Sequence, residues 1–131
     1  MHRLPVAFLA LLLLCGAAHA ENIRAVRPLV GHACMRLALT PEQDADPGQG
    51  VPVHDAPSRS ARVVGWAPSV VVVPAPQQPN AGFLQVLFPD GRPGWVQAGY
   101  LKPWSNPYAP GRRCIPSVMS DGGIGYDFRQ Q

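Results

Sequence analysis

The stretch that decides the fold is FPDGRPGWVQAGYL, residues 88–101. It places a Pro-Asp-Gly turn between two apolar segments, residues 83–88 and 92–97. Pro89 fixes φ for the first corner of a type I turn, and Gly91 can take the left-handed conformation that follows. The stretch therefore predicts a hairpin, followed by a short turn and a last strand at residues 100–103.

The composition of the whole chain points to the same fold class. Sixteen prolines and thirteen glycines among 131 residues disfavour long helices, because proline removes a backbone donor and glycine weakens a helix. The apolar segments are short, rich in valine and bounded by turn residues, which is typical of an all-β domain. Further strands are predicted at 51–55, 61–67 and 70–73, with loops at 41–50 and 74–82 and a strand or helical turn at 35–40.

The first twenty residues, MHRLPVAFLALLLLCGAAHA, have the pattern of a signal peptide. A basic start precedes an apolar run that is too short for a membrane span, and Ala18-His19-Ala20 predicts cleavage before Glu21. The mature chain of 111 residues would be periplasmic or secreted, with no integral membrane span. A lipoprotein with Cys15 as the modified residue is the alternative, which Leu14 just before that cysteine disfavours.

Removal of that segment leaves two cysteines, Cys34 and Cys114. Exported proteins fold where disulfides form, and two cysteines without a C-x-x-C spacing are more simply a structural bond than a redox pair. The mature net charge is +2, and its longest basic run is Arg112-Arg113, so no nucleic-acid stripe is present.

Two blocks of the chain resemble the bacterial SH3-like (SH3b) family, which forms small barrels of five or six short strands. The first is VPVHDAPSRSARVVGWA followed by SVVVV, and the second is FLQVLFPDGRPGWVQAGYL. The resemblance implies an SH3-like barrel over residues 51–103. An N-terminal extension with Cys34 (21–50) and a C-terminal extension with Cys114 (104–131) would be tied together by the disulfide, and the second extension would contain a small hairpin at Asp121-Gly122-Gly123.

The resemblance also implies recognition of a peptide ligand, such as the peptide part of peptidoglycan. Candidate ligand-binding residues are the aromatics Trp66, Tyr100 and Trp104, with His54 and Asp55 nearby. Phe83, Val86 and Leu101 are expected in the core, and the alternation around Trp95 favours the core for that residue too.

Catalysis is not predicted. The chain lacks the G-x-S-x-G, H-E-x-x-H and P-loop patterns, and its two mature histidines, His32 and His54, do not suggest a metal site. We expect no cofactor, and a partner that is either a cell-wall peptide or another envelope protein. The alternative to wall binding is a structural or assembly role in which the domain docks another periplasmic protein.

Overall fold

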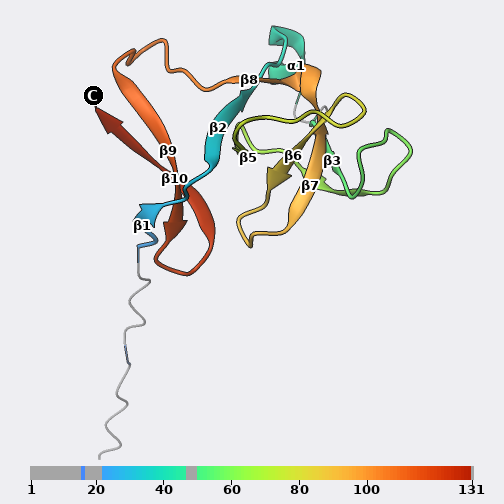
Figure 1. Cartoon of the computed structure of the whole chain (residues 1–131). Coiled ribbons are helices and arrows are strands. Elements are labelled where there is room, and N and C mark those ends of the chain that lie inside the picture. The colour runs from blue at the N-terminus through green and yellow to red at the C-terminus, as the bar shows by residue number, and fades with distance from the viewer. Residues whose placement is uncertain (1–15, 17–21, 47–49, 131) are drawn as a thin grey trace, which may run out of the picture.

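The computed structural model describes residue 16, residues 22–46 and residues 50–130. The strands in these residues form two antiparallel sheets (Figure 1). The predicted signal peptide and its cleavage site lie outside the described residues, apart from Gly16. In the described part of the chain, no helix is long and apolar enough to cross a membrane.

The larger sheet has seven strands in the order β4-β3-β7-β6-β5-β2-β8. The strands are β2 (His32–Leu37), β3 (Pro52–His54), β4 (Val63–Trp66), β5 (Val70–Pro74), β6 (Phe83–Leu87), β7 (Pro93–Gln97) and β8 (Leu101–Pro103). Strands β4 and β8 are its two edges, so among the described residues the hydrogen-bonded order does not close into a barrel. The expected all-β class is confirmed.

The hairpin predicted from residues 83–97 is strands β6 and β7. Its register pairs Phe83 with Gln97 and Leu87 with Pro93. The turn is closed by the amide of Gly91, which donates to the carbonyl of Phe88 at 2.8 Å, and Gly91 has φ of 85°. Only glycine adopts that left-handed backbone at little cost, so the turn chemistry read from the sequence accounts for the hairpin.

Strand β2 joins the larger sheet from outside the range 51–103, since it lies between β5 and β8. Its register pairs Cys34 with Val72 on one side and Leu37 with Leu101 on the other. After β2, a short helix α1 (Pro41–Ala45) stands where the sequence predicts a loop. Thr40 caps it by accepting from the amide of Gln43, whose side chain accepts in return from the amide of Thr40. This reciprocal pair stabilises the first turn.

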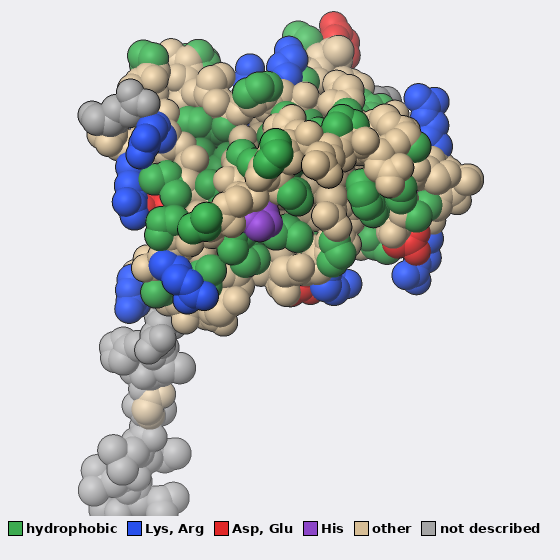
Figure 2. Space-filling model, in the orientation of Figure 1, with side chains coloured by type: hydrophobic (Ala, Val, Ile, Leu, Met, Phe, Trp, Pro, Cys, Tyr) green, Lys and Arg blue, Asp and Glu red, His purple; other side chains and the backbone are tan. Residues whose placement is uncertain are grey.

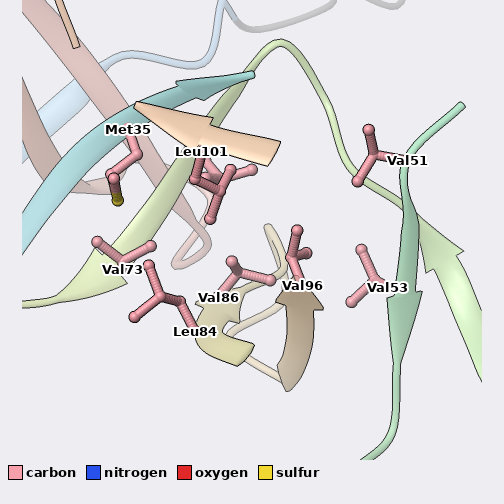
Figure 3. Packing of buried hydrophobic residues seen from close by; sticks show 9 residues of the cluster. Met35, Val51, Val53, Val73, Leu84, Val86, Val96 and Leu101 are labelled. Carbon is pink, nitrogen blue, oxygen red and sulfur yellow. The ribbon is translucent and has the colours of Figure 1, made fainter. Parts of the chain in front are cut away.

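The core lies on one face of the seven-stranded sheet, which curls around it (Figure 3). In a flat sheet β3 and β8 would be about 24 Å apart, five spacings of about 4.8 Å. Yet buried side chains from β3, β7 and β8 belong to one cluster, with Val53 and Val96 fully enclosed. Its buried members are Met35, Val51, Val53, Val71, Val73, Leu84, Val86, Val96 and Leu101.

The expectations for three core residues hold, and the one for Trp95 was wrong. Phe83, Val86 and Leu101 are buried. Trp95 is half-buried and lies outside the core cluster. Neighbouring residues of a strand point to opposite faces, and Val96 takes the inner face of β7, so Trp95 points outward.

The smaller sheet has the order β1-β9-β10, with β1 (Ala25–Pro28), β9 (Arg112–Met119) and β10 (Ile124–Gln130). Residues 120–123 form the turn between β9 and β10, where Gly122 has φ of 84°. The tip of this hairpin touches the β6–β7 turn, because the amide of Ile124 donates to the carbonyl of Pro89 at 2.7 Å.

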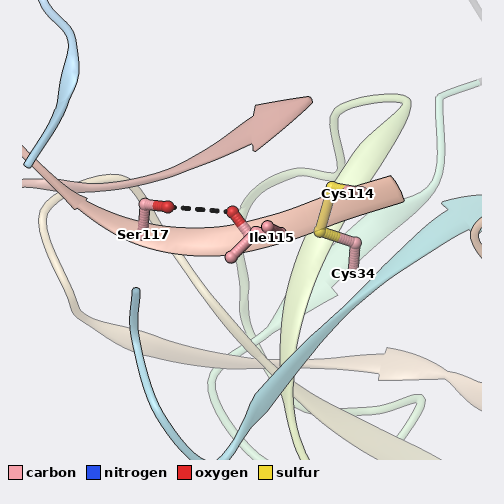
Figure 4. Close-up of a disulfide and its surroundings, with 4 residues drawn as sticks. All are labelled: Cys34, Cys114, Ile115 and Ser117. Carbon is pink, nitrogen blue, oxygen red and sulfur yellow. Dashed lines mark hydrogen bonds between the residues drawn. A yellow bond between two sulfur atoms is a disulfide. The ribbon is translucent and has the colours of Figure 1, made fainter. Parts of the chain in front are cut away.

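A disulfide between Cys34 and Cys114 joins the two sheets, as the sequence predicts (Figure 4). It links β2 to β9 across a Cα–Cα distance of 6.1 Å. Cys34 and Met35 are consecutive on β2, so Met35 enters the core while Cys34 points outward to the smaller sheet. Strand β2 therefore connects the core of the larger sheet, through Met35, to the smaller sheet, through the disulfide.

Replacing both cysteines, Cys34→Ala with Cys114→Ala, should lower the free energy of unfolding. The bond closes a loop with a sequence separation of 80, and the loop-entropy model gives about 4 to 5 kcal/mol for that length. Urea unfolding followed by circular dichroism measures the change, and wild-type protein treated with a reductant is the control. Equal midpoints for the oxidised wild type and the double variant would contradict the stabilising role.

Gly94→Ala should destabilise the larger sheet. A Cβ atom at this position would overlap Cγ1 of Val53, which is fully buried and cannot move away. Overpacking of this kind costs about 1 to 3 kcal/mol. Gly99→Ala is the matched control, because a Cβ there meets nothing within 4 Å. Thermal unfolding of both variants compares them, and a Gly94→Ala midpoint no lower than that of Gly99→Ala would argue against this packing.

Candidate functional site

The five ligand-binding residues predicted from the sequence do not form one cluster. Trp66, on the edge strand β4, is 63% exposed, and a face of its ring lies close to Gly50. Tyr100 lies in the 3₁₀ turn η1 (Ala98–Tyr100) and is half-buried against the core cluster. Of the five, only Trp104 lines one of the cavities described below.

His54 and Asp55 are occupied by contacts within the protein. His54 is 5% exposed, and its Nδ1 lies 2.9 Å from the carbonyl oxygen of Ala61. A carbonyl only accepts, so Nδ1 carries the proton and donates. The imidazole also meets the ring of Phe83 edge-on at 5.7 Å. Asp55 forms an exposed ion pair with Arg62 at 3.5 Å. Both residues therefore hold the β3–β4 connection.

A groove of about 420 Å³ lies where the two sheets meet at the disulfide. We call it the disulfide groove; it is lined by residues 32–34, Trp104, residues 112–114 and Pro116. Its walls come from β2, from the segment after β8 and from β9. The disulfide holds β2 and β9 together, so the groove exists without a ligand to shape it.

An aromatic row continues from this groove along β10. Trp104 stacks on Phe128 with ring centroids 5.3 Å apart and planes 27° apart. Phe128 in turn meets Tyr126 at 5.2 Å, and the guanidinium of Arg112 lies 5.9 Å from the Phe128 ring centroid. Phe128 remains 38% exposed. The row offers flat apolar surface beside a cation, an arrangement that suits extended ligands with both apolar and charged parts.

The charge of the disulfide groove is positive. Arg112 and Arg113 are exposed and line it, no carboxylate lines it, and neither arginine is ion-paired among the described residues. Arg36 and Lys102 add two cations opposite each other on β2 and β8, on the same sheet face as Cys34. In Figure 2, hydrophobic side chains are scattered over the middle of the face, and Lys and Arg lie around its periphery together with a few Asp and Glu side chains. The groove is therefore suited to an anionic ligand.

Four residues of this site were missed by the sequence analysis: Arg112, Arg113, Tyr126 and Phe128. In the sequence the run Arg112-Arg113 indicates only that no nucleic-acid stripe is present, and the tail predicts only a small hairpin. The alternation in IGYDF, which puts Tyr126 and Phe128 on one face of a strand, was the available signal. What it could not show is that this face meets Trp104.

Comparison with known proteins gives no relative. No protein-family model matches the chain, and no curated protein or solved structure matches it at a significant level. Across residues 16, 22–46 and 50–130, no group of three or more His, Cys, Asp or Glu side chains is placed to hold a metal ion. The proposed function therefore rests on the geometry and the charge of the grooves.

The carboxyl group of Asp90 has a displaced pKa. The pKa of Asp90, on the β6–β7 turn, is held below 3.8 because the backbone amide of Arg92 donates to its Oδ1 at 3.0 Å, and the Arg92 guanidinium donates to Oδ2. Hydrogen bonds to the ionised form favour it. The contribution of this carboxylate to stability is thus present above its unfolded-state pKa and is lost as pH falls through the lowered folded-state value.

Arg92→Ala should leave part of the lowering of the Asp90 pKa in place, because the backbone amide of residue 92, its largest cause, remains. NMR titration of the Asp90 carboxyl in the wild type and in the variant measures the pKa. A pKa that returns to 3.8 in the variant would show that the guanidinium, and not the backbone, holds the carboxylate ionised.

Proposed function

We propose that the chain is a non-catalytic exported SH3-like binding module that recognises a peptide ligand, such as the peptide part of peptidoglycan, in the cell envelope. The observation that carries the proposal is the disulfide groove, which Trp104, Arg112 and Arg113 line and where the Arg112 guanidinium lies 5.9 Å from the Phe128 ring that stacks on Trp104. Cell-wall peptides carry free carboxylates, and guanidinium groups bind carboxylates through charge-assisted hydrogen bonds.

The SH3-like part of the proposal is supported by the number and order of strands. Six short strands, β3 to β8, fall within residues 52–103, and their sheet curls around a single core. The participation of β2 and the open edges at β4 and β8 are departures from a simple closed barrel. Export is supported by the signal-peptide pattern and by the disulfide, a bond typical of oxidising compartments.

Retention on purified sacculi tests the proposed function. Wild-type protein should sediment with sacculi, and the double variant Arg112→Gln with Arg113→Gln should lose at least about tenfold in affinity, since each charge-assisted hydrogen bond is worth about 1.5 to 3 kcal/mol. Trp104→Ala should weaken binding as well. Binding should also fall as salt is added, because the two arginines are exposed.

The matched control is the double variant Arg27→Gln with Arg59→Gln, which removes the same two charges from exposed positions in β1 and in the β3–β4 connection. Its retention should equal that of the wild type. If wild-type protein does not sediment with sacculi, wall binding is ruled out. If the two double variants lose retention equally, attraction is by net charge alone and the groove is not the site.

The edge strand β4 favours a second candidate function, docking of another envelope protein. Among the strands that the structure describes, it pairs with β3 alone, and its Val63 and Trp66 are 44% and 63% exposed. Proteins recognise extended partners by adding a strand to such an edge. A photo-crosslinking residue at position 66 should then capture one defined partner, and Trp66→Ala should reduce its copurification. Capture at the 97% exposed position of Tyr108 is the control for accidental contact.

A further inference from the structure

A second cavity, of about 490 Å³, lies beneath the proline-rich loop that joins β5 to β6. We call it the loop cleft. One side is lined by residues 73 and 74 at the end of β5 and by loop residues 76–81, and the other side is lined by Leu84, Gln85 and Trp95. Its volume falls in the range of about 300 to 1,000 Å³ that is usual for small-molecule sites. None of the five residues proposed from the sequence for ligand binding is part of it.

The chemistry of the loop cleft differs from that of the disulfide groove, because no charged side chain of the described residues lines it. Its polar groups are the side-chain amides of Gln77, Gln78, Asn80 and Gln85. The amides of Gln78, Asn80 and Gln85 make no hydrogen bond to any described residue. Each amide offers both donors and an acceptor. A ligand matched to this lining is neutral and carries groups that also donate and accept, as hydroxyls do.

Trp95 gives the cleft an aromatic surface. On β7 it stands directly opposite Gln85 of β6, so the indole and that amide lie side by side on the outer face of the sheet. No other aromatic ring stacks on Trp95 among the described residues, and its indole N–H has no partner there and is not enclosed. An indole face attracts C–H groups through its negative π surface, while the N–H remains to donate.

The loop that covers the cleft is held in place at three points. The amide of Ala75 donates to the carbonyl of Gly31 at 2.9 Å, and the side chain of Gln77 donates to Sδ of Met35 at 3.1 Å. At its end, Asn80 and Phe83 exchange two backbone hydrogen bonds, of 2.8 and 2.9 Å. Prolines restrict the segment further. The cleft is therefore formed before a ligand arrives, which lowers the entropic cost of binding.

Ala81 lines the cleft with φ of 49°, a left-handed backbone that a residue with a Cβ adopts at a cost. Ala81 and Gly82, the latter with φ of 81°, are the two central residues of the tight turn that the Asn80–Phe83 hydrogen bonds close, and such a turn requires a left-handed backbone at both positions. The turn fixes the end of the loop, and the uncharged amide lining and the outward-facing indole are the features that point to a ligand.

We infer that the loop cleft binds a neutral oligosaccharide of about two sugar rings, a size its volume accommodates. One sugar face stacks on Trp95, and the ring hydroxyls exchange hydrogen bonds with the amides of Gln78, Asn80 and Gln85. This site is separate from the disulfide groove and does not rest on the proposed function. The described lining offers no cation to pair with an acidic sugar or a carboxylate-bearing peptide, which favours a neutral sugar.

The three tryptophans of the chain make the test direct. Each gives one indole N–H signal in a ¹⁵N–¹H spectrum, assigned by substitution. Titration with di-N-acetylchitobiose, cellobiose and maltose in separate arms should move the Trp95 signal with a dissociation constant on the order of 1 mM. The signals of Trp66 and Trp104 should stay in place. A disaccharide of galacturonic acid should move none of the three.

Variants establish which side chains bind the sugar. Trp95→Ala should abolish binding measured by calorimetry, and Asn80→Ala and Gln85→Ala should each weaken it about three- to tenfold, as expected for one lost hydrogen bond. Trp95→Phe keeps an aromatic face without the N–H donor and should bind more weakly than wild type. It keeps the test valid if Trp95→Ala does not fold. The double variant Arg112→Gln with Arg113→Gln should bind sugar as the wild type does.

Three results would overturn the inference: no shift of the Trp95 signal with any neutral disaccharide at tens of mM, equal shifts of all three indoles, or a shift confined to Trp104. Sugar binding and sacculus retention fail independently. Loss of sugar binding with retention intact removes the loop-cleft inference alone, and the reverse removes the proposed peptide site alone.

Discussion

The Cys34–Cys114 bond is the constraint on which the arrangement of the two sheets depends. Strand β2 carries it on the outer face, while the next residue, Met35, is sealed in the core on the inner face. The smaller sheet is thus fixed to a strand that cannot move without disturbing the core. Away from the bond the sheets also touch where Ile124 reaches Pro89. The disulfide groove is the space left beside this covalent junction.

The features that could be predicted from the sequence are those decided by local chemistry. Gly91 and its flanking alternation determine the β6–β7 hairpin, and the same alternation places Val86 in the core. The pattern could not decide which of Trp95 and Val96 faces inward, because both are apolar and a one-residue shift of register exchanges them. In the structure the smaller Val96 lies on the inner face of β7 and is buried in the core.

The sequence did not predict which strands pair when they lie far apart along the chain. The insertion of β2 between β5 and β8 brings together segments that no local signal relates. For the same reason Trp104 was recognised as a candidate on its own, while its partner Phe128 and the neighbouring Arg112 were not. His54 shows the opposite error, since a histidine on a strand looked available but satisfies its ring nitrogen on the carbonyl of Ala61. Contacts that cross the fold decide which polar groups remain for a ligand.

The pairing of β1 with β9 has a consequence for the order in which the molecule is assembled. Ala25, near the start of the described chain, stands opposite Met119, near its end. Synthesis proceeds from the N-terminus, so β1 emerges well before β9, the strand with which it pairs. Hairpins such as β6–β7 need only neighbouring residues and can form before that. The smaller sheet is therefore completed later than the β6–β7 hairpin, and its first strand depends on a strand far along the chain.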